Sequence, residues 1–390
     1  MRAGLILLCL AYVLSQFFRA FLAVLTVDLE RDIGAGPEEL ALASGLWFLT
    51  FAAMQIPVGW ALDRIGPRLT ASVLLLIGGG GGAALFAVAT EPAHVNLAMI
   101  LIGVGCSPVL MASYFIFARE FPPARFATLA ALMLGVGSVG NLVASYPTAL
   151  AAEWIGWRGT LAALALISAL VAVGLWAKVR DPAQLPGEAR GSLLDLLRMP
   201  VLWLILPMML VNYAPAGAIR GLWMGPYLGD VFGMSTAQIG QATLVMGLAM
   251  IVGTLAYGPL DRLLGTRKWV IFAGNLIGAL ALAGLVWRID DSVWLSVALM
   301  SVVGFMGGSF PVLIAHGRAF FPPHLVGRGV TLMNLFGIGG VGLAQLVSGR
   351  LHDATIASGP VAAYAAIFGF FAAALFLGLA AYLFSRDSMD

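Results

Sequence analysis

The sequence predicts an all-α membrane protein with twelve transmembrane helices. Of its 390 residues, 61% are hydrophobic and only 10% are charged, whereas a typical soluble domain carries about 25% charged residues. The apolar residues form long continuous runs, which are typical of membrane helices, rather than the alternating segments of a membrane barrel. At about 20 residues per span, the chain accommodates roughly a dozen helices with short loops. An ordinary soluble enzyme is therefore excluded.

Charged and Pro/Gly-rich breaks separate the apolar stretches. The first stretch is too long for a signal-peptide core and has no clean cleavage site, so we expect it to remain as a span. Hydropathy places the spans at 4–27, 41–62, 69–90, 95–117, 125–150, 157–178, 201–229, 237–260, 269–287, 294–317, 327–350 and 361–385.

Lys and Arg are distributed unequally between the two sides of the membrane. With a cytoplasmic N-terminus, the cytoplasmic side holds 15 of the 21 and the opposite side holds four. This predicts a multi-pass protein of the cytoplasmic (inner) membrane with both termini in the cytoplasm. The longest polar stretch, 180–200, is expected to be a cytoplasmic loop between two six-helix bundles, 1–179 and 201–390.

The two halves contain an internal repeat. FAREFPPARFATLAALMLGVGSVG at 117–140 matches HGRAFFPPHLVGRGVTLMNLFGIGGVG at 316–342, and GWALDRIGPR at 59–68 matches YGPLDRLLGTRK at 257–268. Matched residues are 198 to 202 positions apart, which is an even number of spans and preserves direction in the membrane. Parallel repeats of this kind are typical of transporters with a substrate path between their halves.

GWALDRIGPR resembles the loop signature of the major facilitator superfamily, and a degenerate copy follows the eighth span. With the spans and the repeat, the resemblance covers the whole chain. It implies the fold of that superfamily, with two pseudo-symmetric bundles, and a secondary transporter that works as a monomer by alternating access. It also implies that the Asp and its basic neighbours make charge contacts that stabilise the outward-open state. The gating residues assigned in this way are Gly59, Asp63, Arg64, Gly66, Arg68, Asp261 and Arg262.

A second resemblance concerns the substrate. SQFFRAFLAVLTVDL around Arg19 resembles the first span of organophosphate:phosphate antiporters and related organic-anion transporters, which carry one Arg in span one and another in span seven. Arg220 supplies the second. The glycine runs of spans five and eleven are similar to those of nitrate/nitrite porters, but the substrate arginines of those porters lie in spans two and eight, which contain none here. The resemblance favours an organic or phosphate-like anion.

Arg19 and Arg220 are the two charged residues that hydropathy places deep inside spans, 201 residues apart. A midplane Arg costs about 2.5–3.5 kcal/mol on insertion scales, so it normally faces a polar cavity. All 19 Asp and Glu lie in loops or at span ends, so we expect the counter-ion to be an anionic substrate held by guanidinium groups. Such a site predicts antiport, or symport with H⁺ or Na⁺. The alternative for each Arg is a structural bond to backbone carbonyls or to a neighbouring helix.

Other polar and aromatic residues inside the spans would complete the site. The candidates are Tyr12, Gln16, Tyr114, Tyr146, Tyr213, Trp223, Tyr227, His316 and Asn334. Helical spacing puts those of spans one and seven on the arginine-bearing faces. An interfacial aromatic belt is the alternative for Trp223 and Tyr227, and an interhelical hydrogen bond is the alternative for His316, the one His inside an expected span. Asp28 and Asp230, at outer span ends, are candidates for a gate or proton site, or are solvated helix ends.

No chemistry beyond binding is expected. The GxGxxG runs beginning at Gly135 and Gly337 do not follow strands, so we interpret them as close helix contacts. The sequence has no nucleophile–His–acid set and no metal-spaced cluster, which predicts no enzyme, cofactor or metal. A net charge of +2 offers no surface for nucleic acid. Two alternatives stay open, an efflux pump for hydrophobic or cationic compounds, which usually needs a membrane carboxylate, and a non-transporting sensor, which needs an output domain.

Overall fold

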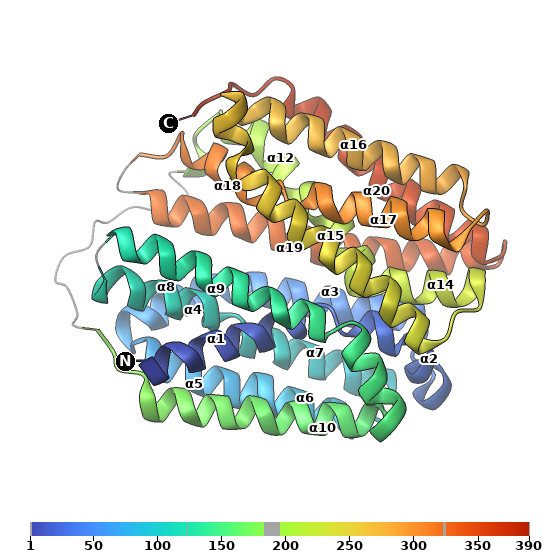
Figure 1. Ribbon diagram of the computed structural model, residues 1–390, viewed down its shortest axis with the longest axis horizontal. Coiled ribbons are helices and arrows are strands. Elements are labelled where there is room, and N and C mark those ends of the chain that lie inside the picture. Colours follow the sequence, from blue (N-terminus) through green and yellow to red (C-terminus); the bar gives the residue numbers. More distant parts are fainter. Residues whose placement is uncertain (1, 122, 183–195, 323–324, 390) are drawn as a thin grey trace. The chain divides into compact units, whose positions relative to one another are not determined.

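The computed structural model describes residues 2–121, 123–182, 196–322 and 325–389. In these ranges the chain forms helices joined by turns and contains no strand (Figure 1). Within these ranges, ten helices are long and apolar enough to cross a membrane, and a bent pair makes an eleventh if its two helices are counted as one span. The apolar part of α9, Leu132–Val143, is shorter. The all-α membrane fold is confirmed.

The chain divides into two compact units. Unit 1 comprises Met1–Gly187 with Thr236–Gly240, and unit 2 comprises Glu188–Ser235 with Gln241–Asp390. Residues 183–195 of the predicted loop lie outside the described residues, so the bounds of that loop and of the two bundles stay predictions.

Unit 1 contributes six helical spans, most of which begin at a proline in the first turn, where its missing N–H costs no hydrogen bond. In chain order they are α1 (Arg2–Phe17) with α2 (Leu22–Ile33), α3 (Pro37–Ala53) with α4 (Gln55–Arg64), α5 (Pro67–Leu74) with η1 (Leu75–Gly80) and α6 (Gly81–Ala87), α7 (Pro92–Cys106) with α8 (Pro108–Glu120), α9 (Pro123–Val143), and α10 (Tyr146–Lys178).

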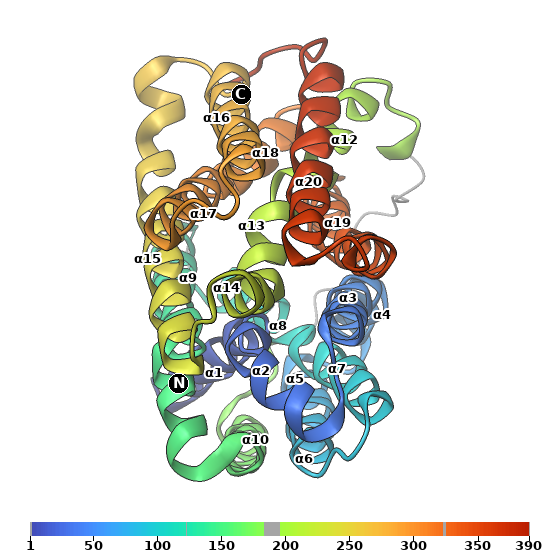
Figure 2. The same ribbon diagram turned by 90° about the vertical axis from the view of Figure 1, so that its right-hand side faces the viewer.

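Unit 2 has the corresponding helices, apart from the first residues of α15, which cluster with unit 1. They are α12 (Leu202–Asn212) with α13 (Ala214–Ala218), η2 (Ile219–Trp223) and α14 (Met224–Phe232), then α15 (Thr236–Leu264), α16 (Lys268–Trp287), α17 (Val293–Gly307) with α18 (Phe310–Arg318), α19 (Val326–Ile356), and α20 (Pro360–Tyr382). Within this unit α12, α19 and α20 lie side by side (Figure 2).

Several expected spans depart from a continuous α-helix. The first is interrupted at 18–21, and its halves α1 and α2 are bent by 55°. The seventh contains the π-helical segment η2. The long element α10 has a kink at Gly156, whose φ of 73° is non-helical, so a second helix begins there, at the expected start of the sixth span at 157. Hydropathy measures length and apolarity, so a break among apolar residues does not register in it.

The glycine runs of the fifth and eleventh spans bring helices into close contact. A Cβ added to Gly140 of α9 would collide with the carbonyl oxygen of Val13 on α1. In unit 2 a Cβ added to Gly340 of α19 would collide with the carbonyl oxygen of Leu210 on α12. The same helix pair therefore packs through glycine in both units, which confirms the interpretation of these runs as packing elements.

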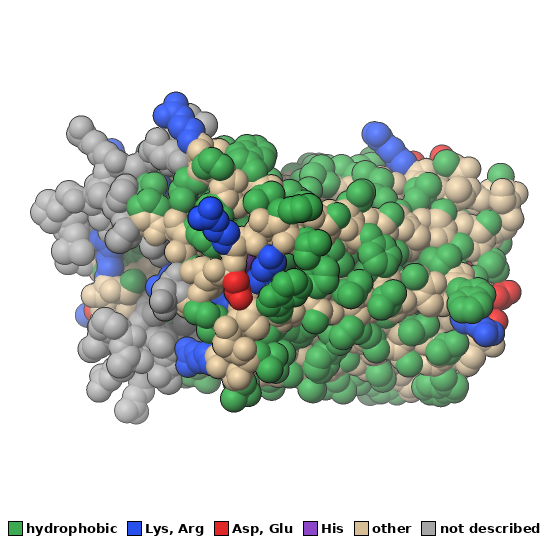
Figure 3. All heavy atoms as spheres, turned by 90° about the horizontal axis from the view of Figure 1, so that it is seen from above, with side chains coloured by type: hydrophobic (Ala, Val, Ile, Leu, Met, Phe, Trp, Pro, Cys, Tyr) green, Lys and Arg blue, Asp and Glu red, His purple; other side chains and the backbone are tan. Residues whose placement is uncertain are grey.

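The outer faces of the helices are apolar. Leu166 and Leu170 on α10 are each 62% exposed, and Leu280 on α16 is 56% exposed. Figure 3 shows a face on which hydrophobic side chains cover the middle, while Lys, Arg, Asp and Glu lie toward its ends. Exposed apolar surface of this extent suits contact with lipid rather than water.

Candidate functional site

Arg19 lies in the break between α1 and α2 rather than within a helix. Its Cζ atom is 5.5 Å from the ring centroid of Trp47 and 5.4 Å from that of Phe51, both on α3. Ring faces attract a guanidinium electrostatically without occupying its N–H donors. The Nε atom is buried and has no hydrogen-bond partner among the described residues. Arg19 therefore combines a half-buried charge with a buried, unused donor.

Polar side chains of α1 and α8 meet in the same unit. The Gln16 amide donates to the Tyr12 hydroxyl at 3.2 Å, and Tyr114 of α8 is close enough to Tyr12 to interact electrostatically. The Gln16 Oε1 atom is buried without a partner among the described residues. The structure thus brings three predicted residues together, while Tyr146 lies half-buried at the start of α10.

Arg220 lies in η2 and is 4% exposed. A Cβ added to Gly247 of α15 would lie 3.1 Å from both Nε and Nη2 of Arg220, so the guanidinium packs against the backbone of that helix. Tyr213 is close enough to act on it electrostatically. π-Helical segments occur frequently at functional sites. Both predicted arginines therefore lie where their spans depart from an α-helix.

The aromatic residues that follow Arg220 are fully buried in unit 2. Trp223 and Tyr227 are each 0% exposed. The indole of Trp223 donates to Ser348 Oγ at 2.8 Å, and the hydroxyl of Tyr227 donates to the Ile289 carbonyl at 2.5 Å. The alternative of an interfacial belt is wrong for both residues, because neither faces the surface. Their role as substrate ligands stays a prediction.

His316 has both ring nitrogens within hydrogen-bond distance of a partner. Its Nδ1 is 2.7 Å from the Tyr382 hydroxyl and its Nε2 is 2.9 Å from the Arg386 carbonyl oxygen. This geometry favours the interpretation of an internal hydrogen-bonding histidine. Asn334, the last predicted ligand, lies half-buried on α19.

The expectation that His316 is the one histidine inside a span is wrong. His352 also lies in a spanning helix, because α19 continues to Ile356, six residues beyond the expected end at 350. Arg350 marked that end in the sequence, but an exposed charge on a helix surface does not terminate the helix.

The first copy of the loop motif, at 59–68, is bound by a carboxylate that follows the last helix of unit 1. Asp181 accepts a hydrogen bond from the Arg68 amide at 2.8 Å, and its Oδ2 lies 3.8 Å from Arg68 Nε. Gly66 has φ +99°, a backbone conformation that favours glycine. Asp63 and Arg64 are exposed, and Gly59 lies on α4. The ion-pair partner of Arg68 in this structure is therefore Asp181.

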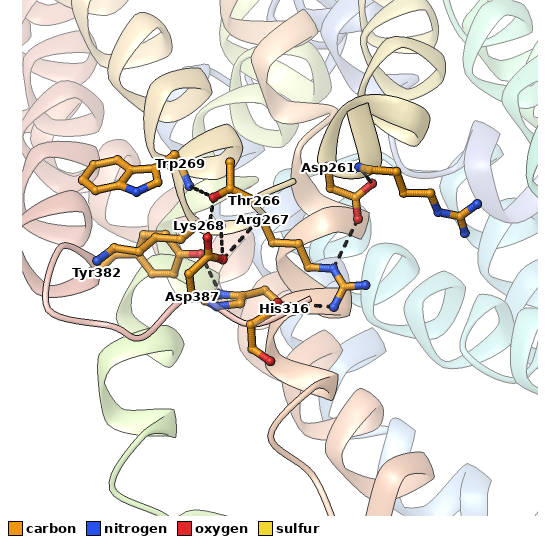
Figure 4. A network of polar contacts seen from close by, with 10 residues as sticks. Asp261, Thr266, Arg267, Lys268, Trp269, His316, Tyr382 and Asp387 are labelled. Atoms are coloured by element: carbon orange, nitrogen blue, oxygen red, sulfur yellow. Dashed lines mark hydrogen bonds and ion pairs between the residues drawn. The ribbon is translucent and has the colours of Figure 1, made fainter. Parts of the chain in front are cut away.

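The second copy is fastened in the same way (Figure 4). Asp387, which follows α20, accepts hydrogen bonds from the amides of Arg267 and Lys268 at 3.2 and 3.0 Å and from the Thr266 hydroxyl. Burial acts to raise the pKa of Asp387, but these hydrogen bonds outweigh it and hold the pKa below its ordinary value. Within the motif, Arg267 Nε lies 3.2 Å from Asp261 Oδ2. Arg262 is exposed.

Four residues in these contacts are not among those predicted from the sequence: Trp47 and Phe51 beside Arg19, and Asp181 and Asp387 at the two loop motifs. Trp47 and Phe51 are spaced one helical turn apart in a stretch without charged residues, so their sequence carries no signal beyond that spacing. Asp181 and Asp387 each follow the last span of their half by three to five residues, and this shared acidic position is a signal that the repeat offers. Among the described residues, no group of three or more His, Cys, Asp or Glu is placed to hold a metal ion.

Comparisons with known proteins agree with this architecture. The family model described as Major Facilitator Superfamily matches residues 8–224 and 217–389. The putative metabolite transport protein NicT of Pseudomonas putida is 20% identical over 83% of the chain and 80% of NicT. The 4-hydroxybenzoate transporter PcaK of Pseudomonas putida is 28% identical over 45% of the chain and 39% of PcaK.

Solved structures show the same fold. A bacterial homologue of the human lysosomal transporter Spinster, in an inward-facing and occupied conformation, superposes with a TM-score of 0.78 at 16% identity, over 98% of this chain and 96% of that one. A D-xylose-proton symporter superposes with a TM-score of 0.78 at 16% identity, over 98% of each chain.

Proposed function

This chain belongs to the Major Facilitator Superfamily and is a multi-pass membrane transporter rather than an enzyme, and from that premise we propose that it carries a small organic anion by alternating access. Arg19 of unit 1 and Arg220 of unit 2 are the anion-binding groups, one from each copy of the repeat. The protein resides in the cytoplasmic membrane with both termini inside.

The observation that best supports this proposal is the environment of Arg19. Its charge rests on two aromatic ring faces and its buried Nε has no partner among the described residues. An unsatisfied buried donor costs about 1–3 kcal/mol, more for a charged group, and a bound carboxylate or phosphate removes that cost. Guanidinium groups bind such anions through paired hydrogen bonds.

The rings beside Arg19 suggest the body of the substrate. Trp47 and Phe51 stack at a centroid distance of 5.1 Å, which offers an apolar aromatic wall next to the cation. A carboxylate carried on an aromatic or apolar body matches both features. The similarity to a 4-hydroxybenzoate transporter supports this substrate class.

A thermal-shift assay on the purified protein tests the proposal. The ligands are 4-hydroxybenzoate, benzoate and inorganic phosphate, and the variants are Arg19→Gln and Arg220→Gln. The matched control is Arg288→Gln, because Arg288 also lies 5.2 Å from a tryptophan ring but its side chain is 54% exposed. We expect an anion to stabilise wild type and the control and to lose its effect on both site variants. Equal stabilisation of all four proteins would contradict the assignment.

A further inference from the structure

A buried histidine of unit 2 lies among aromatic side chains from two other elements. His352 on α19 is 5% exposed, and its Nε2 has no hydrogen-bond partner in the described part of the chain. Its ring centroid is 5.5 Å from that of Trp223 on η2 and 5.4 Å from that of Tyr364 on α20. The imidazole therefore has a fixed position and one ring nitrogen without a protein partner.

Two acidic groups act electrostatically on this ring. The Tyr364 hydroxyl donates a hydrogen bond to the carboxylate of Asp230 on α14. Asp230 and Asp353 are the carboxylates that act electrostatically on His352, the first from across the helix interface and the second from the same helix. A positive charge on the imidazole would therefore be attracted by these carboxylates, which offsets part of the cost of burying it.

We propose that His352, Asp230 and Tyr364 form a proton-binding site in unit 2. The neutral imidazole carries one N–H, and its second ring nitrogen takes one proton from water. The resulting imidazolium is paired electrostatically with the Asp230 carboxylate, which Tyr364 holds in place. Release of the same proton restores the neutral ring.

The π-helical segment connects this site to Arg220. Trp223, which contacts His352, is the last residue of η2, and Arg220 is the second. The Trp223 indole also donates to Ser348, one turn before His352 on α19. Protonation at His352 therefore acts on the segment that holds Arg220, and the proton is the coupling ion. This last step rests on the proposed function, whereas proton binding itself does not.

Histidine NMR tests proton binding directly. The chain has four histidines, so selective isotope labelling gives four imidazole signals, and His352→Gln removes and thereby assigns one. We expect that signal to titrate between about pH 5 and 8. Asp230→Asn removes the facing charge and should lower the midpoint by about one pH unit or more. His94→Gln is the matched control, because the His94 side chain is 41% exposed, and it should leave the midpoint unchanged.

An imidazole at position 352 that stays neutral throughout this range would overturn the site. So would a midpoint that does not respond to Asp230→Asn. Unchanged signals from the other three histidines show that His352→Gln is folded, so the loss of one signal does not reflect unfolding.

Transport tests the coupling. In proteoliposomes with 4-hydroxybenzoate as the probe, an inward-directed proton gradient should raise accumulation by wild type and by His94→Gln, and the gradient should have no effect on His352→Gln. Exchange of the anion by wild type without any response to the gradient would overturn the coupling while leaving the proposed function intact. Failure of the anion panel to bind would overturn the proposed function, while the NMR titration still decides the proton site.

Discussion

At the scale of single residues, the role proposed for Arg19 requires a guanidinium rather than any positive charge. Its planar group lies over Trp47 and Phe51 and offers paired donors, which a lysine ammonium does not. Arg19→Lys should therefore raise the concentration of 4-hydroxybenzoate needed for half-maximal uptake about tenfold, given that hydrogen bonds to charged groups contribute about 1.5–3 kcal/mol. Uptake kinetics in proteoliposomes measure this. Arg288→Lys should have no effect, and an Arg19→Lys variant with wild-type kinetics would show that only charge is needed.

The residues that sequence could and could not identify differ in a physical way. A charge deep in an apolar run costs free energy wherever it points, so Arg19 and Arg220 are visible from sequence alone. Trp47 is apolar in an apolar span, and its contact with Arg19 depends on how helices pack. The sequence predicts a span end at Arg350 and so leaves His352 outside the span, although the helix continues to Ile356.

At the scale of helices, the number and order of spans follow from hydropathy, whereas their breaks do not. The interruption at 18–21 falls in FFRAF, which contains no Pro or Gly. The irregular seventh span has Pro215 and Gly221, yet such residues are common in membrane helices and do not by themselves locate a π-helix. Each break contains an arginine, Arg19 in the first and Arg220 in the second.

Glycine at the helix contacts gives a test at this scale. Gly140→Ala places a methyl group against the Val13 carbonyl, whereas Gly135→Ala, on the same helix, meets nothing within 4 Å. Overpacking costs typically 1–3 kcal/mol, so Gly140→Ala should lower the melting temperature of the detergent-solubilised protein and Gly135→Ala should not. Two variants that melt alike would mean that α1 and α9 separate readily.

At the scale of the whole molecule, the repeat extends to the segments after the last helix of each unit. Asp181 and Asp387 accept hydrogen bonds from the amides at the start of α5 and α16. In each unit, the segment after the last helix is therefore bound to the start of the third span. The loop signature by itself does not predict these contacts, because each Asp lies more than 110 residues along the chain from the amide that it binds.

Asp387 predicts a dependence of stability on pH. Because hydrogen bonding holds its pKa below the ordinary value, its contribution is present above that ordinary value, about 3.9, and is lost as the pH falls through the lowered folded-state pKa. Asp387→Asn should therefore lower the melting temperature at pH 7, with the difference from wild type vanishing at acidic pH. Asp291→Asn is the control, because its ion pair with Arg288 is exposed and worth about 0–1 kcal/mol. A deficit that persists at acidic pH would contradict this account.

The anion-binding role proposed for the two arginines also predicts how the whole transporter turns over. Alternating access passes through an occluded state in which Arg19 and Arg220 are withdrawn from water, and a bound anion supplies the opposite charge that lowers the desolvation cost. Without a pH gradient, uptake of labelled 4-hydroxybenzoate should therefore be faster into proteoliposomes preloaded with the unlabelled anion than into empty ones. Counterflow kinetics measure the ratio, and preloading with a neutral analogue, 4-hydroxybenzyl alcohol, is the control. Equal rates into loaded and empty vesicles would show that the empty carrier reorients as readily as the occupied one.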